Sequence, residues 1–280
     1  MTHNTVKNSK REQSLLIFST ILLVLSALFV FIISCDSGPI DKPLAENEQN
    51  LNSLTEKERS EGWILLFDGK TFEGWRGVGR EEIPQGHWII EEGSIKKLPS
   101  RDGPRQEDGQ PLQGGDILTE RTFKNFELSL EWKISPGGNS GIKYNVSEGM
   151  SISYPPRHAA LGFEYQVLDD EKHPDANIND NRPAAALYDL IAPKNKALKP
   201  VGAFNTARIV CVGNHGEHWL NGEKVLEYDL KTPEMDMLLE KSKYRNILGF
   251  EEKRKGHIVL QDHTDVVWFR NIKIREIEPF

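Results

Sequence analysis

Strict alternation of apolar and polar residues over Asn125–Ile134 is the feature that most constrains how this chain folds. The apolar positions share one face of an extended strand and the polar positions share the other, which is the pattern of a half-buried β-strand. The apolar positions are Phe126, Leu128, Leu130, Trp132 and Ile134. Such a strand must bury one face against a second layer, so it predicts a layered β structure.

Shorter runs of the same kind recur along the rest of the chain, separated by turn residues such as Asn221-Gly222. They are Trp63–Phe67, Trp88–Glu91, Asp116–Thr119, Gly141–Val146, Gly162–Leu168, Ala207–Val212, His215–Leu220, Lys224–Tyr228, His257–Leu260 and Val266–Ile277. The only helical pattern is Pro233–Lys243. Many strands with little helix predict an all-β sandwich of two antiparallel sheets.

The start of the chain has the pattern of an export signal. Basic residues among the first eleven precede the apolar run Leu15–Ile33, and the run ends at Ser34-Cys35. This ending resembles the lipobox of bacterial lipoproteins, so residues 1–34 are predicted to be a signal peptide and Cys35 the lipidation site. The alternative is an uncleaved transmembrane anchor, because about 19 apolar residues can span a bilayer. Both interpretations predict a membrane-anchored protein of the cell envelope, periplasmic or on the outer surface.

Residues 35–60 are polar and without periodicity, so they are interpreted as a flexible linker before one domain over residues 61–278. Cleavage before Cys35 removes three positive charges and one negative charge, and the formal net charge changes from −7 to −9. An acidic chain without a basic stripe is not expected to bind nucleic acid. With Cys35 lipidated, Cys211 has no partner and is predicted to be a small core residue.

Several blocks of the domain, taken in order, resemble the 3-keto-disaccharide hydrolase domain family. They include Trp63–Lys70, Asn139–Ile142, Gly162–Asp170, Ala186–Leu190 and Gly256–His263. The resemblance spans Gly62 to Ile277 and rests on the order and spacing of the blocks, because no single block is specific. It implies a concanavalin A-like jelly roll and an enzyme that cleaves glycosides oxidised to a ketone at sugar carbon 3.

The ketone of such a substrate acidifies the proton on carbon 2, so a base can remove it and the bond at carbon 1 breaks by elimination, followed by hydration. The protein must therefore supply a base, an acid for the leaving oxygen and a group that stabilises the enediolate. The predicted catalytic residues are Glu164, Asp170, His173 and His263. Glu164 lies on a predicted strand, Asp170 and His173 lie in the loop at its end, and His263 ends another strand.

The predicted substrate-binding residues surround these positions. Gln166 shares a strand face with Glu164, and Gln261 shares one with His263. Lys143 and Tyr144 lie on opposite faces of one strand, so one of them is expected to face the groove; Tyr188 is the fifth candidate. No cofactor is firmly predicted. A divalent cation held by Glu164, His173 or His263 is possible, although no dedicated metal motif is present.

Two other functions compete with this hypothesis. Jelly rolls also serve as carbohydrate-binding modules without catalysis, and the fold alone does not separate the two classes. A retaining glycoside hydrolase requires two carboxylates about 5 Å apart, which Glu164 with Asp169 or Asp170 could supply. The predicted partners are a carbohydrate substrate and the membrane that holds the lipid.

Overall fold

The computed structural model describes residues 51–100, 115–154, 159–252 and 254–278. The chain divides into the units Met1–Leu44 and Ala45–Phe280, and only the second contains described residues. The predicted signal peptide and Cys35 therefore lie outside the described residues. Among the helices of the described ranges, none is long and apolar enough to cross a membrane.

The described chain forms two antiparallel sheets, which confirms the predicted all-β jelly-roll sandwich. The eight-stranded sheet has the order β11-β10-β9-β6-β13-β4-β3, with β1 also paired to β13. Its strands are β1 (Trp63–Leu65), β3 (Trp88–Glu91), β4 (Ser94–Lys97), β6 (Phe126–Ile134), β9 (Asn205–Val212), β10 (His215–Leu220), β11 (Glu223–Asp229) and β13 (Val267–Glu276).

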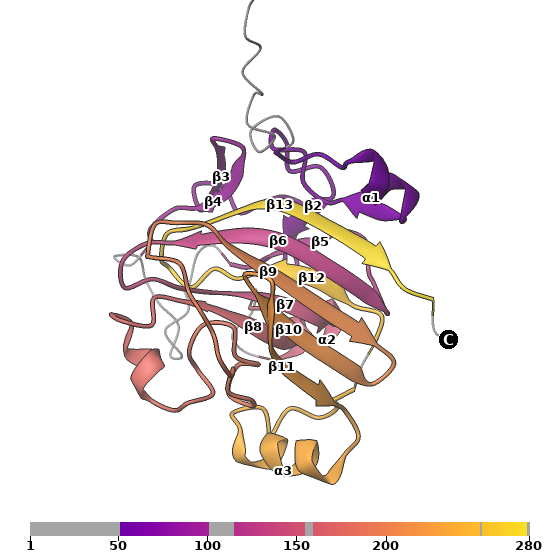
Figure 1. Ribbon diagram of the computed structural model, residues 1–280, viewed down its shortest axis with the longest axis vertical. Helices are drawn as coiled ribbons and strands as arrows, with labels where there is room; N and C mark the ends of the chain where they lie inside the picture. The colour runs from indigo at the N-terminus through magenta and orange to yellow at the C-terminus, as the bar shows by residue number, and fades with distance from the viewer. Residues whose placement is uncertain (1–50, 101–114, 155–158, 253, 279–280) are drawn as a thin grey trace, which may run out of the picture. The chain divides into compact units, whose positions relative to one another are not determined.

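The five-stranded sheet has the order β2-β5-β12-β7-β8 and forms the second layer, behind β6, β9 and β10 in Figure 1. Its strands are β2 (Trp75–Gly77), β5 (Ile117–Thr119), β7 (Asn139–Val146), β8 (Phe163–Leu168) and β12 (His257–Leu260). The helices are short: α1 (Glu56–Ser60), α2 (Glu148–Ser153), α3 (Pro233–Lys241) and the single 3-10 turn η1 (Pro174–Asn177).

The alternation in β6 builds the core as predicted. All five of its apolar side chains are at most 3% exposed, and the polar positions Ser129, Glu131 and Lys133 are half-buried. Trp88 and Trp132 are buried in the same core, and so is the side chain of Cys211. Apolar side chains between the two sheets therefore hold the sandwich together.

The predicted linker is too long at its C-terminal end. Residues 51–60 belong to the fold, because Asn52 is only 8% exposed and donates its backbone N–H to Asn271 Oδ1 over 2.6 Å. Its side-chain amide also donates to the carbonyl of Gly93. Helix α1 follows and begins with a capping box in which Thr55 and Glu58 satisfy each other's backbone N–H groups. The segment is polar and has no apolar periodicity, so no pattern in it indicated that it packs against the domain.

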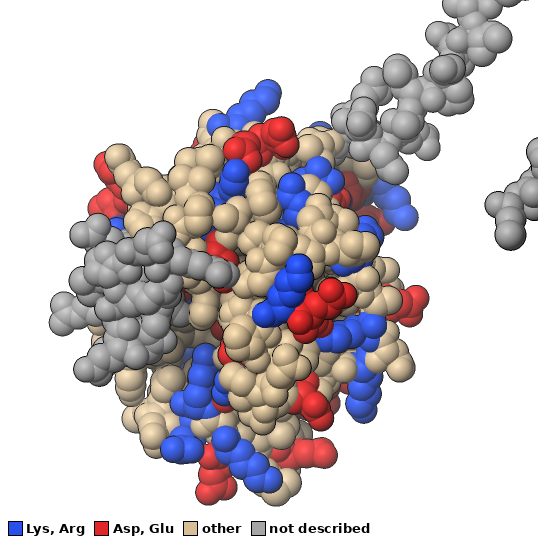
Figure 2. All heavy atoms as spheres, turned by 90° about the vertical axis from the view of Figure 1, so that its left-hand side faces the viewer, with Lys and Arg blue, Asp and Glu red and all other residues tan. Residues whose placement is uncertain are grey.

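The surface shown in Figure 2 carries charges of both signs. On the described part of this face, lysine and arginine side chains alternate with aspartate and glutamate side chains. Neighbouring charges of opposite sign largely cancel at a distance, because salt screens exposed charges beyond about 8–10 Å. The described part of this face therefore shows no large patch of a single charge.

Candidate functional site

Strands β7 and β8 present two chemically different faces. Their register pairs Lys143 with Glu164 and Tyr144 with Phe163. Because side chains alternate along a strand, Tyr144 points into the sandwich core and Lys143 and Glu164 point to the outer face of the five-stranded sheet. Gln166 follows Glu164 on the same outer face. A polar surface therefore lies on the reverse side of an apolar one.

A cavity of about 400 Å³ lies over this outer face. Its walls come from β7, β8, the loop after η1, the segment after α3 and the residues that follow β12. Nine residues line it: Asn139, Glu164, Gln166, Asp175, Arg182, Tyr188, Lys243, Gln261 and His263. Five of these were predicted from sequence, and the cavity brings together segments separated by more than a hundred residues in the chain.

Glu164 is the most unusual group in the cavity. It is 3% exposed, and within the described ranges its carboxylate forms neither a hydrogen bond nor an ion pair. Burial raises the pKa of Glu164, and the positive charges of Lys143 and Lys243 counteract this only in part. A buried carboxylate without partners is unfavourable, and a raised pKa is typical of a group that exchanges protons.

Gly141 on β7 makes room for this carboxylate. A Cβ atom at residue 141 would lie 2.8 Å from Cδ and 2.9 Å from Cγ of Glu164. Side chains essentially never approach so closely, so with any other residue at position 141 the Glu164 carboxylate would have to move. The neighbouring strand thus fixes where the carboxylate points.

Two amide side chains beside Glu164 also lack partners. Gln166 is fully buried, and neither its Oε1 nor its Nε2 atom has a hydrogen-bond partner in the part of the chain that the structure describes. Gln261 is 5% exposed, and its Oε1 atom is unpaired. Unpaired buried amides cost free energy, so an oxygen-rich ligand in the cavity would supply the missing hydrogen bonds.

A hydrogen-bonded group forms another part of the cavity wall. The Tyr188 hydroxyl donates to Asp175 Oδ2 over 3.1 Å, and Asn139 Nδ2 lies 3.4 Å from the same oxygen. Arg182 lies 4.0 Å from Asp175 and forms a closer ion pair of 2.8 Å with Asp189. Burial and the nearby carboxylates raise the pKa of Tyr188, so its hydroxyl remains protonated and donates to Asp175.

His263 connects this cavity to a neighbouring hollow of about 360 Å³ that His173 also lines. The two imidazole rings lie 6.3 Å apart between centroids and are nearly perpendicular. Burial lowers the pKa of His263, so its ring is neutral near neutral pH and can accept a proton. His173 Nδ1 accepts a hydrogen bond from the backbone N–H of Asp175.

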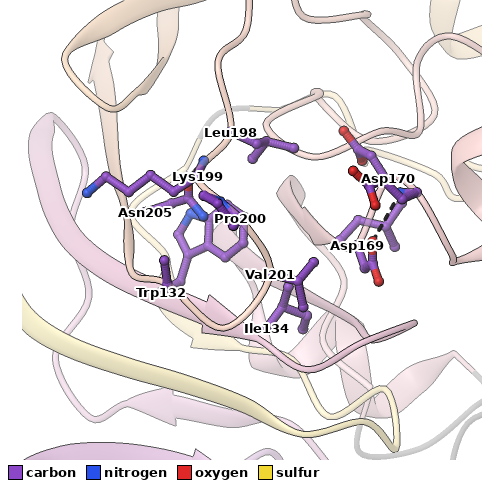
Figure 3. A pocket seen from close by; sticks show the side chains of 12 residues that line it. Trp132, Ile134, Asp169, Asp170, Leu198, Lys199, Pro200, Val201 and Asn205 are labelled. Atoms are coloured by element: carbon purple, nitrogen blue, oxygen red, sulfur yellow. Dashed lines mark hydrogen bonds between the residues drawn. The ribbon is translucent and has the colours of Figure 1, made fainter. Parts of the chain in front are cut away.

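Asp170 does not reach the cavity. It accepts a hydrogen bond from the backbone N–H of Ala184 over 2.8 Å and forms an ion pair with Lys196. It lines a different pocket of about 240 Å³, to which Asp169 and Leu198 also contribute (Figure 3). The placement of Asp170 among the catalytic residues is therefore corrected: this carboxylate joins three segments of the chain.

The expectation for Tyr144 is corrected as well, and Lys143 lies beneath the cavity. Tyr144 is fully buried in the core, with its hydroxyl 2.8 Å from His218 Nε2. Lys143 is on the outer face, but its ammonium group is 3.0 Å from Asp116 and donates to the carbonyl of Ala160. Lys143 therefore acts on Glu164 through its charge, without lining the cavity.

Sequence reasoning missed four cavity residues, namely Asn139, Asp175, Arg182 and Lys243. Asp175 belonged to an acidic loop that already drew attention, and Asn139 preceded a recognised strand. Arg182 and Lys243 had no local signal, because both come from irregular segments.

The residues suggested for a divalent cation are not arranged as a metal site. Across the described ranges, one set of His and carboxylate groups converges closely enough for a metal ion: His215, Glu217 and Glu227 on β10 and β11. Lys224 already forms ion pairs with both of these glutamates. Glu164, His173 and His263 do not converge in this way, so no step is derived through a cation.

Comparisons with known proteins identify the family of the chain. Residues 62–275 match the profile of the family described as 3-keto-alpha-glucoside-1,2-lyase-like domain. The chain is 42% identical over 247 residues to a 3-keto-disaccharide hydrolase from Bacteroides thetaiotaomicron, covering 81% of this chain and 83% of that protein.

Two solved structures from Parabacteroides distasonis, both of candidate glycosyl hydrolases, share the fold. The first has a TM-score of 0.68 and 29% identity, and the match covers 82% of this chain and 100% of the other. The second has a TM-score of 0.57 and 26% identity, covering 77% of this chain and 99% of the other.

Proposed function

This chain belongs to the 3-keto-alpha-glucoside-1,2-lyase-like domain family, and from that premise we propose that it cleaves the glycosidic bond of glycosides that carry a ketone at carbon 3. The observation that carries the proposal is Glu164, a buried carboxylate with a raised pKa and no partner of its own, placed in a 400 Å³ cavity. A cavity of this size suits a sugar unit.

Glu164 acts as the base in this mechanism. It takes the proton from carbon 2, and the electron pair of the broken C–H bond becomes an enolate with the C3 ketone. The electrons then return to form the C1–C2 double bond while the C1–O bond breaks. The raised pKa stabilises the protonated carboxyl group, so the same proton is available for the departing oxygen. The products are an alcohol and an unsaturated 3-keto sugar.

The remaining step is the addition of water across the new double bond, which yields the free 3-keto sugar. His263 lines the cavity with a neutral ring, so it can accept a proton from this water. Gln166 and Gln261 provide unpaired amide groups for the sugar hydroxyls. The hydrogen-bonded group that contains Tyr188 and Asp175 forms another part of the binding site.

Neither carboxylate suggested from the sequence is free to act as the second carboxylate of a double-displacement glycosidase. That mechanism requires a second carboxylate about 5 Å from the first. Asp169 accepts hydrogen bonds from the backbone N–H groups of Gly137, Glu171 and Lys172, and Asp170 is paired with Lys196. Both carboxylates suggested as partners for Glu164 are therefore engaged in the structure of the loop.

The experiment is to incubate the purified full-length chain with 3-keto-trehalose and with unoxidised trehalose, with and without a chelator. Release of a monosaccharide from the 3-keto substrate alone is expected. In D2O, unreacted substrate or product should acquire deuterium at carbon 2. Cleavage of both sugars at similar rates, or no cleavage of a 3-keto glycoside by correctly folded protein, would contradict the proposal.

We further propose that the domain acts outside the cytoplasm and is tethered through a lipid on Cys35. The basic start, the apolar run Leu15–Ile33 and the small residue before Cys35 support this. Metabolic labelling with a radioactive fatty acid should mark the wild type and the variant Cys211→Ala, but not Cys35→Ala. Equal labelling of Cys35→Ala would exclude this site of attachment.

A further inference from the structure

Lys243 occupies a place in the cavity that neither its sequence context nor its secondary structure explains. It lies two residues beyond the end of α3, where the chain has no regular structure. Its backbone N–H donates to Asp189 Oδ2 over 2.7 Å, and the other oxygen of Asp189 binds Arg182. The backbone at residue 243 is thereby fixed to the opposite loop, and the side chain starts from a defined point.

The Lys243 side chain lies against two tyrosine rings. Its Nζ atom lies 4.3 Å from the ring centroid of Tyr188 and 5.1 Å from that of Tyr244. Tyr188 is itself held by its hydrogen bond to Asp175, and Tyr244 is stacked on Phe250 at 3.9 Å between centroids. An ammonium group over ring faces is stabilised without being neutralised.

The neighbouring cations are neutralised and Lys243 is not. Arg182 forms an ion pair with Asp189, and Lys143 below the cavity forms one with Asp116. Within the described ranges, no carboxylate forms an ion pair with the Lys243 ammonium group. Lys243 lines the cavity and is partly exposed to solvent. The surrounding protein still excludes enough water from the ammonium group to lower its pKa.

Glu164 and Lys243 thus line one cavity with opposite charges and no ion pair between them. Their charges nevertheless act on each other: Lys243 lowers the pKa of Glu164, and Glu164 raises that of Lys243. A base and a cation that line one cavity are what the removal of a proton beside a carbonyl group requires. The base takes the proton, and the cation receives the charge that moves to the oxygen.

We propose that Lys243 is a catalytic residue whose ammonium group binds the C3 carbonyl oxygen of the substrate and stabilises the negative charge that develops there. This inference rests on the proposed function. When Glu164 takes the C2 proton, the electron pair of that bond moves toward carbon 3 and the oxygen becomes an enolate beside Lys243. When the C1–O bond breaks, the charge leaves with the departing oxygen, and Lys243 is unchanged.

The test compares the variants Lys243→Met and Lys243→Arg with Lys241→Met, which removes an exposed lysine at the end of α3 and serves as a matched control. Each full-length protein is assayed on two 3-keto-glucosides that differ in the leaving group, p-nitrophenol or methanol. We expect Lys243→Met to lower kcat by about 10²–10³-fold on both substrates, as for other lost oxyanion contacts.

The conservative variant Lys243→Arg should recover part of the loss, Lys241→Met should behave as the wild type, and the melting temperatures should agree. Full activity in Lys243→Met would overturn the proposal. A loss confined to the methyl glucoside would also overturn it, because that pattern assigns Lys243 to protonation of the leaving oxygen. Inactivity of the wild type on both substrates would instead refute the proposed function.

Discussion

Polar groups are buried on both faces of strands β7 and β8, but the two faces differ in how completely these groups are hydrogen-bonded. On the inner face, the Tyr144 hydroxyl lies 2.8 Å from His218 Nε2 and 2.9 Å from the Tyr228 hydroxyl. On the outer face, Glu164 and Gln166 are similarly buried, and their side chains have no hydrogen-bond partner among the described residues. Burial alone therefore does not distinguish structural from functional polar residues; completeness of hydrogen bonding does.

The hydrogen bonding of the inner group is complete because each of its polar atoms has a partner. His218 Nδ1 lies 3.1 Å from the carbonyl of Ala185, which can only accept, so this nitrogen carries the proton. Nε2 then accepts from Tyr144, whose oxygen accepts from Tyr228. Such a closed group stabilises the core. The outer groups lower the stability of the empty protein, and a bound sugar would supply their missing contacts.

The variant Glu164→Gln gives the sharpest test of this contrast. The amide keeps the shape and removes the base, so the rate on a 3-keto glycoside should fall by about 10²–10⁴-fold. The melting temperature should stay the same or rise, because an unpaired buried charge has been removed. Steady-state kinetics and calorimetry on the same preparation would measure both. A clear drop in melting temperature would show that Glu164 is structural.

The variant Gly141→Ala should misplace the carboxylate without changing its chemistry. The new Cβ would lie 2.8 Å from Glu164 Cδ, so the side chain must move, and displacements of about 1 Å cost up to about 10²-fold in rate. Gly149→Ala is the matched control, because nothing lies within 4 Å of the Cβ position there. Equal kcat/KM values for the two variants would show that β7 does not position Glu164.

The variant Tyr144→Phe should have the opposite effects to those of Glu164→Gln. Loss of the hydroxyl removes the partner of His218 Nε2 and one partner of the Tyr228 hydroxyl, so the free energy of unfolding should fall by about 1–3 kcal/mol. Activity of the folded protein should stay within about twofold of the wild type. Urea unfolding combined with assays below the transition would separate the two quantities. An inactive but equally stable variant would place Tyr144 in the site after all.

The smallest expected effect concerns how stability changes with pH. Burial lowers the pKa of His218 to about 4, so its contribution to stability is lost as pH falls from its ordinary value of 6.5 toward 4. The pKa of Glu164 is raised, so its contribution is lost as pH rises above its ordinary value of 4.5. Urea unfolding should therefore show Glu164→Gln gaining stability relative to the wild type as pH rises from 4.5. A constant difference would mean that the pKa of Glu164 is not raised.

Local patterns predicted most strands, since the alternation in β6 and the Asn221-Gly222 hairpin depend only on neighbouring residues. The missed strands β2 and β4 have three and four residues, and β4 carries two lysines, so neither shows a period. The missed helices α1 and α2 are one to two turns long. The positions of these elements depend on tertiary packing, which cannot be recognised in a short stretch of sequence.

The candidate site was predictable where it lies on a strand. Glu164 and Gln166 share a face by alternation, and this placed both in the cavity. Asp170 was chosen because acids cluster there, but short acidic side chains in a loop commonly bind backbone N–H groups, as Asp170 does with Ala184. Arg182 and Lys243 reach the cavity only through tertiary contacts with Asp189.

The position of β13 has a consequence for how the protein is made. This last strand pairs with β6 on one side and with β4 and β1 on the other, as the contact of yellow β13 with magenta β6 in Figure 1 illustrates. The larger sheet is therefore incomplete until the C-terminus has been synthesised, and its contacts span most of the sequence. Such folds form slowly and late. Formation of the larger sheet therefore has to wait for β13.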